Sequence, residues 1–90
     1  MKLENDALTF AEVERWFARA DTLAADGSVD LSGVRQVDSA GVALLLELAR
    51  RARARGARLQ LVAPPEQLRG LLVFFGLADI FDIHAQQRHA

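Results

Sequence analysis

The sequence has 90 residues, of which 51% are hydrophobic and 26% charged, with a net charge of −1 and no cysteine. This length predicts one small domain over residues 1–90, and the weak net charge argues against general nucleic-acid binding. Because cysteine is absent, we expect no disulfide. The two histidines lie outside any cluster of ligands, so we expect no metal site, and we expect no cofactor either. No apolar run approaches the roughly 20 residues that span a membrane, so we expect no transmembrane helix.

The first predicted helix runs from about Phe10 to Ala25, and residues 2–6 before it form at best an edge strand. Thr9 with Glu12 three residues later has the form of a capping box, and Gly27 is suited to end the helix because glycine tolerates a left-handed conformation. Apolar residues at helical spacing predict the buried stripe, which comprises Phe10, Val13, Phe17, Ala20 and Ala24, flanked by Trp16 and Leu23.

The rest of the chain alternates between strands and helices. This alternation predicts an α/β fold with a small mixed, mostly parallel sheet and helices packed beside it. The predicted elements are a strand over residues 28–31, a helix from about 39 to 55, a strand over 58–62, a helix from about 66 to 75, and a turn with a short last strand over 77–83.

The turn Asp-Ser-Ala-Gly at residues 38–41 is the most informative stretch. Ser39 lies where a loop meets a helix start, so its hydroxyl is predicted to cap the helix. Gly41 leaves the first turn bare, which would let a partner approach closely. A phosphate on Ser39 would lie at the positive end of the helix dipole. No glycine-rich phosphate loop or nucleophile elbow occurs, so we expect no enzymatic activity.

Two helices carry more apolar residues than one buried stripe needs. Leu44 and Leu48 share a stripe with Gly41, away from the predicted sheet-facing residues Val42, Leu45, Leu46 and Ala49. In the last helix, Val73 and Phe74 lie off the inner face of Leu68, Leu71, Leu72 and Phe75. These residues either pack against neighbouring helices or form an exposed patch with an arginine rim, which would mark an interface.

Five arginines and no acid lie within residues 50–58, at the end of the second long helix. One interpretation is a solvated helix end, where the positive charges complement the helix dipole. The other is an electrostatic contact with an acidic partner or an anionic membrane surface.

The chain resembles the STAS domains that sulphate transporters and anti-sigma factor antagonists share. The resemblance covers about residues 7–83 and implies the STAS fold. The family opens with a two-strand hairpin, and this chain starts too late to supply all of it, so we expect an incomplete first sheet edge. The matching segments are residues 30–34, 37–41, the leucines at 44–46, and residues 58–62, 65–68 and 75–77.

Within that family, Ala7-Leu8-Thr9-Phe10 and the leucine-rich, then arginine-rich second helix resemble the MlaB-like group. This resemblance implies a non-enzymatic cytoplasmic subunit, peripheral to the inner membrane, that binds the ATPase of an MlaFEDB-type phospholipid-transport ABC complex maintaining outer-membrane lipid asymmetry. The alternative is an anti-sigma factor antagonist whose Ser39 is phosphorylated by an anti-sigma serine kinase. The expected partner-binding residues are Ser39, Gly41, Leu44, Leu48, Arg51, Arg55, Val73 and Phe74, with Asp38 fixing the turn.

Overall fold

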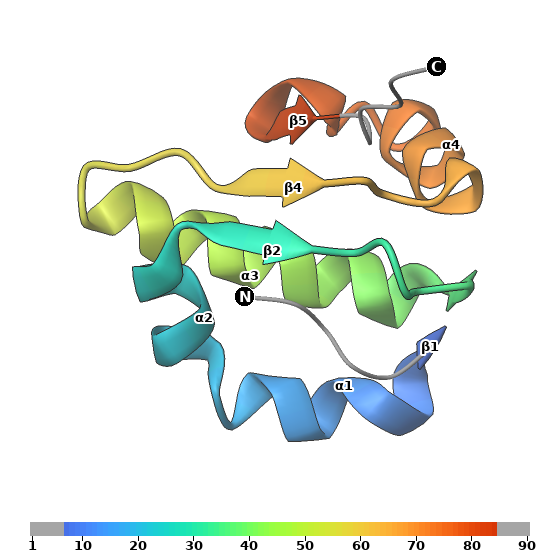
Figure 1. Ribbon diagram of the computed structural model, residues 1–90, viewed down its shortest axis with the longest axis horizontal. Coiled ribbons are helices and arrows are strands. Elements are labelled where there is room, and N and C mark those ends of the chain that lie inside the picture. Colours follow the sequence, from blue (N-terminus) through green and yellow to red (C-terminus); the bar gives the residue numbers. More distant parts are fainter. Residues whose placement is uncertain (1–6, 85–90) are drawn as a thin grey trace, which may run out of the picture.

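The structure is a computed structural model, and it describes residues 7–84 (Figure 1). The edge strand predicted at residues 2–6 lies outside this part of the chain. No helix within residues 7–84 is both long and apolar enough to cross a membrane. In chain order the elements are β1 (Ala7–Leu8), α1 (Phe10–Phe17), α2 (Ala20–Asp26), β2 (Ser28–Asp30), β3 (Gln36–Val37), α3 (Ser39–Ala54), β4 (Gln60–Val62), α4 (Glu66–Phe74), the 3-10 helix η1 (Ala78–Ile80) and β5 (Asp82–His84).

The strands form parallel ladders, as the alternation of strands and helices predicts. A three-stranded sheet has the order β2-β4-β5, in which Val29 lies opposite Leu61 and Leu61 lies opposite Ile83. β1 pairs in parallel with β3. The predicted strands around residues 29 and 61 are therefore neighbours. The predicted α/β class is confirmed, and all strand pairs within residues 7–84 are parallel.

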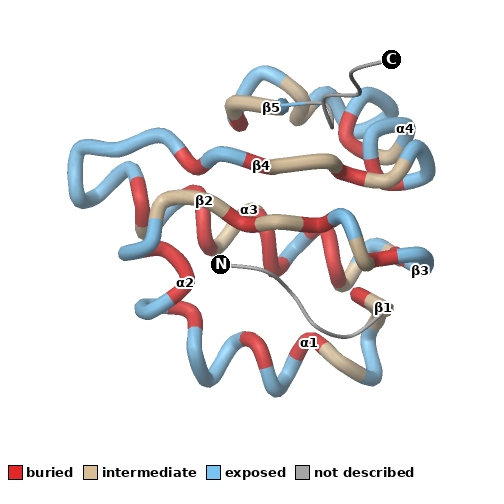
Figure 2. The backbone as a smooth tube through the Cα atoms, in the orientation of Figure 1, coloured by how far each residue is buried: buried red, intermediate tan, exposed pale blue. Residues whose placement is uncertain are grey.

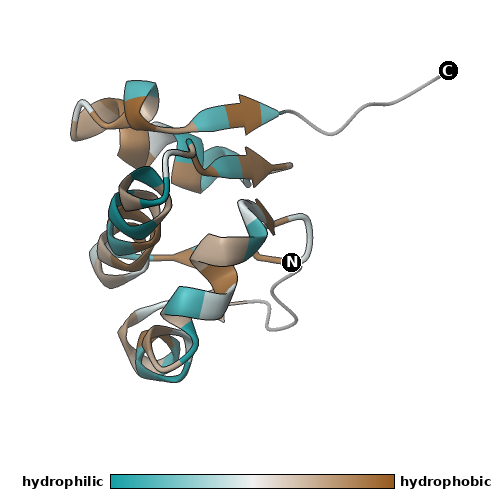
Figure 3. Ribbon diagram, turned by 90° about the vertical axis from the view of Figure 1, so that its left-hand side faces the viewer, coloured by the Kyte–Doolittle hydropathy of each residue, from teal (hydrophilic) through white to brown (hydrophobic). Residues whose placement is uncertain are grey.

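α3 is the central helix of the molecule. Figure 1 shows it lying behind β2 and β4, and it also contacts α1, α2 and α4. Figure 2 shows buried segments along α3 and along the strands in front of it. In Figure 3 the helices carry both hydrophobic and hydrophilic colouring, as expected for helices with one buried and one solvated side. The buried residues of α3 are Gly41, Val42, Leu44, Leu45, Leu48, Ala49 and Ala52.

The single helix predicted from Phe10 to Ala25 is two helices in the structure. Arg19 leaves the helical region with φ −112° and ψ 17°, and its N–H donates to the carbonyl of Trp16, so the last turn of α1 tightens. The bend allows both segments to pack on α3. The predicted stripe is also wrong in part, because Trp16 is buried whereas Phe10 is 79% exposed. Gly27 ends α2 with φ 80°, as predicted.

Candidate functional site

The carboxylate of Asp38 organises the start of α3. Its Oδ1 accepts hydrogen bonds from the N–H groups of Ala40 (2.9 Å) and Gly41 (3.2 Å), and its Oδ2 accepts one from the N–H of Phe10 (3.0 Å). The bond from Phe10 is the largest cause that lowers the pKa of Asp38; burial opposes it, and the bonds from Gly41 and Ala40 add to it. Asp38 therefore joins the start of α1 to the start of α3 and fixes the turn between β3 and α3.

Two predicted caps are wrong. Asp38 is the N-cap of α3, and Ser39 is the first residue inside the helix. Thr9 occupies the N-cap position of α1 but makes no side-chain cap hydrogen bond; the N–H groups of Glu12 and Val13 donate to its backbone carbonyl, and the N–H of Phe10 donates to Asp38. A charged carboxylate with two oxygens is a stronger acceptor than a hydroxyl, and Asp38 accepts two N–H groups at the start of α3 and one at the start of α1.

Ser39 is exposed and borders a shallow hollow of about 330 Å³. Because Asp38 already accepts the first free N–H groups of the helix, the hydroxyl of Ser39 is left at the surface. The hollow beside it is mostly apolar, and its other lining residues are Val42, Ala43 and Leu46 of α3 with Phe75 and Leu77 beyond α4. A small hydroxyl next to open apolar surface suits contact with another protein better than enclosure of a small molecule.

The sequence predicted that Gly41 opens the first turn of α3 to a partner, but the structure shows that it does not. It is buried, and a Cβ atom placed on it would lie 2.2 Å from the backbone oxygen of Leu8. The missing side chain makes room for β1 of the same chain. Gly41 is therefore a packing position, and the prediction of a bare surface there is wrong.

Leu44 and Leu48 are fully buried, so they cannot provide exposed apolar area for a partner. The helical projection assigned them to a free stripe because it considered only the sheet as a neighbour. α3 also packs against α1 and α2, and these contacts cover the second stripe. The alternative in which these leucines pack against neighbouring helices is the correct one.

Arg51 faces α2 rather than the hollow beside Ser39. Its guanidinium pairs with Glu47 (2.6 Å) and with Asp21 of α2 (2.8 Å), while Arg50 pairs with Glu47 (2.7 Å). The hydrogen bonds from Arg50 and then Arg51 lower the pKa of Glu47 to about 2. Arg55, at the C-cap of α3, lines a shallow surface on this same side with Asp21. The predicted rim of Arg51 and Arg55 therefore does not border the Ser39 hollow.

Val73 and Phe74 are 69% and 81% exposed, in agreement with their predicted position off the inner face of the helix. Their contact with a partner stays a prediction. Phe75, which was predicted to face inward, is 47% exposed and stacks edge-to-face on Phe74 with ring centroids 5.3 Å apart. Phe75 lines the Ser39 hollow, whereas Val73 lines a separate shallow surface on α4.

The sequence did not identify Leu46, Phe75 and Leu77 as members of the site, although all three line the hollow. The end of α4 explains the position of Phe75 and Leu77: the N–H of Leu77 donates to the carbonyl of Leu72, and the N–H of Gly76, with φ 71°, donates to that of Val73. This pair of hydrogen bonds is a Schellman motif, which turns the chain back beside its own helix. The Phe-Gly-Leu order at residues 75–77 is the signal that could have located this turn.

Comparisons with known proteins agree on the fold. A family model described as "Mlab, STAS domain" matches residues 5–83. A proposed anti-sigma factor antagonist from Thermotoga maritima superposes with a TM-score of 0.79 at 20% identity, over 94% of this chain and 78% of that one. The anti-sigma factor antagonist SpoIIAA in its unphosphorylated form gives 0.66 at 22% identity, over 90% and 74%. No curated protein matches the chain significantly.

Proposed function

The chain belongs to the family of MlaB-like STAS domains, and from this membership we propose that it is a regulatory subunit that binds the ATPase of an MlaFEDB-type phospholipid-transport ABC complex. STAS domains are protein-interaction modules, generally without catalysis of their own. In this role the partner hydrolyses ATP, and the chain stabilises the competent state of that partner because it binds this state better than others. The subunit acts in the cytoplasm, at the inner face of the inner membrane.

The observation that carries the proposal is the exposed Ser39 beside an apolar hollow at a rigid helix start. The carboxylate of Asp38 holds this start in place, and the backbone of Leu8 packs directly against Gly41. A partner side chain that enters the hollow meets Leu46 and Phe75, and its polar groups meet the hydroxyl of Ser39. Interfaces commonly combine an apolar centre with a few polar contacts in this way. Val73 and Phe74 would extend the contact along α4.

An anti-sigma factor antagonist is the second candidate function. The observation that favours it is the similarity of the fold to two such proteins, one of them solved in an unphosphorylated form. The hydroxyl of Ser39 is exposed, so a kinase could reach it. In this role, only the unmodified chain would bind the kinase.

The test is the affinity of the purified chain for the ATPase subunit of the Mla-type transporter of its own organism, measured by calorimetry. Ser39→Arg places a long charged side chain in the interface and is expected to lower the affinity at least about tenfold. Thr22→Arg is the matched control, because Thr22 is an exposed hydroxyl residue on α2, beside the far end of α3.

Binding of the wild type and of Thr22→Arg with loss of binding by Ser39→Arg supports the proposal, provided that all three chains unfold at similar temperatures. Failure of the wild type to bind the ATPase contradicts it. If the wild type instead binds the serine-kinase anti-sigma factor of the same organism, the second candidate replaces the first.

A further inference from the structure

The hollow beside Ser39 is one end of a longer groove. A second hollow shares Leu46 with it, and a third, of about 420 Å³, shares Ala49, Arg53 and Ile80 with the second. Together they follow α3 from Ser39 to Arg53, which is about 21 Å at the helical rise of about 1.5 Å per residue. We call this the α3 groove; its floor is Val42, Leu46 and Ala49, and its wall is Phe75, Leu77 and Ile80.

The α3 groove keeps apolar surface in contact with water. Phe75 and Ile80 in its wall are 47% and 42% exposed. The residues of the floor recur at spacings of three and four along one side of α3. Val42 and Ala49 are buried and Leu46 is half-buried, so Leu46 and the wall residues provide the accessible apolar surface. Exposed apolar side chains gathered along a groove are a feature of surfaces that bind another protein.

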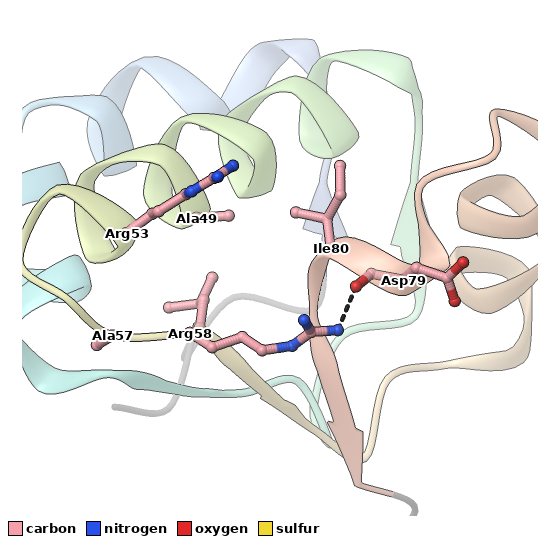
Figure 4. A pocket seen from close by; sticks show the side chains of 7 residues that line it. Ala49, Arg53, Ala57, Arg58, Asp79 and Ile80 are labelled. Carbon is pink, nitrogen blue, oxygen red and sulfur yellow. Dashed lines mark hydrogen bonds between the residues drawn. The ribbon is translucent and has the colours of Figure 1, made fainter.

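The far end of the groove is positively charged. Figure 4 shows Arg53 and Arg58 lining the third hollow from α3 and from the segment before β4. Arg58 is engaged: it pairs with the carboxylate of Asp82 (2.8 Å) and donates to the carbonyl of Asp79, so it holds the η1 wall in place. Figure 4 also shows that the carboxylate of Asp79 is directed away from both arginines.

Arg53 is the arginine of the groove that has no internal partner. It is exposed, and its guanidinium makes no ion pair or hydrogen bond within the described part of the chain, residues 7–84. In contrast, Arg50 is held by Glu47. The excess charge at the end of the groove therefore belongs to Arg53, and it complements an acidic group of the occupant.

The walls of the groove determine the form of the occupant. They consist of side chains from α3, from the end of α4, from η1 and from residues 57–59 before β4, and no strand residue within residues 7–84 lines them. The backbone of an extended peptide would find no ladder of hydrogen bonds there. An α-helix satisfies its own backbone groups, so it can lie on apolar side chains without leaving polar groups unpaired.

We propose that the α3 groove receives an amphipathic α-helix of the partner protein, and that an acidic side chain about four turns along that helix pairs with Arg53. Its apolar residues, at spacings of three and four, contact Leu46, Phe75 and Ile80, while its other end lies at Ser39. The identity of the partner rests on the proposed function; the form and charge of the docking element rest on the groove itself.

The experiment reverses one charge inside the groove and one outside it. Arg53→Glu and Arg55→Glu make the same charge change near the same helix end, but Arg55 lies on the α2 side and was the rim residue predicted from the sequence. Each variant and the wild type are titrated with the ATPase subunit, and with the serine-kinase anti-sigma factor in parallel. We expect Arg53→Glu to lower the affinity at least about tenfold, and Arg55→Glu to change it less than about threefold.

A second variant tests the docked helix from the other side. An acid-to-lysine exchange in the partner that restores the binding of Arg53→Glu, but weakens that of the wild type, identifies the paired acid. Equal losses for Arg53→Glu and Arg55→Glu overturn the inference while leaving the proposed function intact. A wild type that binds the kinase alone overturns the proposed function. The affinities of Arg53→Glu and Arg55→Glu for the kinase then test the inference in the same way. A wild type that binds neither protein overturns both.

Discussion

A single carboxylate explains more of the candidate site than the serine beside it. Asp38 accepts N–H groups from two helix starts, whereas Ser39 contributes an exposed hydroxyl. The adjacent Asp-Ser pair offered two plausible caps to a sequence-based analysis. Only the tertiary contact with Phe10, 28 residues away, shows which of the two takes the donors. The turn could therefore be predicted, but the division of roles within it could not.

Removal of the Asp38 carboxylate should destabilise the fold, whereas removal of the Ser39 hydroxyl should not. We expect Asp38→Ala to cost about 1–2 kcal/mol, because three N–H groups lose their acceptor. Ser39→Ala should change stability by less than about 0.5 kcal/mol. Urea denaturation followed by the fluorescence of Trp16, the single tryptophan and 4% exposed, measures both. A larger loss for Ser39→Ala than for Asp38→Ala would restore the predicted serine cap.

Gly41 and Gly70 provide a matched pair of helical glycines. Gly41→Ala would force a methyl group against the backbone oxygen of Leu8, so β1 must move, and we expect a loss of about 2–3 kcal/mol. Gly70 has no atom within 4 Å of a Cβ position, so Gly70→Ala should stabilise α4 by about 0.5–1 kcal/mol. The same urea titration compares the two. Similar effects of both variants would refute the close approach of β1 to α3.

At the scale of the elements, helical periodicity predicted most of the helices and misjudged which sides are free. The predicted sheet-facing residues Val42, Leu45 and Ala49 are buried, but so are Leu44 and Leu48 on the other stripe. A projection shows how residues are arranged around a helix axis, and it does not show how many neighbours the helix has. The arginines show that periodicity does not reveal the neighbours of a helix, because Arg51 forms an ion pair with Asp21 on α2, which is distant in the sequence.

The ion pairs of Glu47 with Arg50 and Arg51 within α3 should give stability a specific dependence on pH. Glu47 has a pKa lowered to about 2 from 4.5 by hydrogen bonds from Arg50 and Arg51. A lowered folded-state pKa means that the carboxylate stabilises the fold above pH 4.5 and that this contribution is lost as the pH falls toward about 2. The melting temperatures of wild type and Glu47→Gln should therefore differ near neutral pH and converge across this range.

The control for this titration is Glu14→Gln. Glu14 is exposed on α1 and has no ion pair within residues 7–84, so its exchange removes the same charge without breaking an ion pair. A pH profile for Glu47→Gln that matches the profile for Glu14→Gln would show that the ion pairs of Glu47 do not stabilise the fold.

At the scale of the whole molecule, the order of strands and helices was enough to predict the fold class, and the structure confirms it. The α3 groove was beyond such an analysis, because its floor and its wall are separated by about thirty residues of sequence. The Schellman turn at Gly76 and the hydrogen bonds of Arg58 place the wall against α3. Neither contact has a periodicity that a sequence pattern could display.

Modification of Ser39 should change what the molecule binds and leave its fold intact. The N–H groups of Ala40 and Gly41 already donate to Asp38, so a phosphate on Ser39 would remain at the surface, beside another negative charge. We expect Ser39→Asp to melt near the temperature of the wild type. If the chain serves the transporter, intact-mass measurement after incubation with ATP and the serine-kinase anti-sigma factor should show an unmodified chain. A phosphate on the wild type that is absent from Ser39→Ala, with release of the kinase by Ser39→Asp, would instead establish the antagonist function.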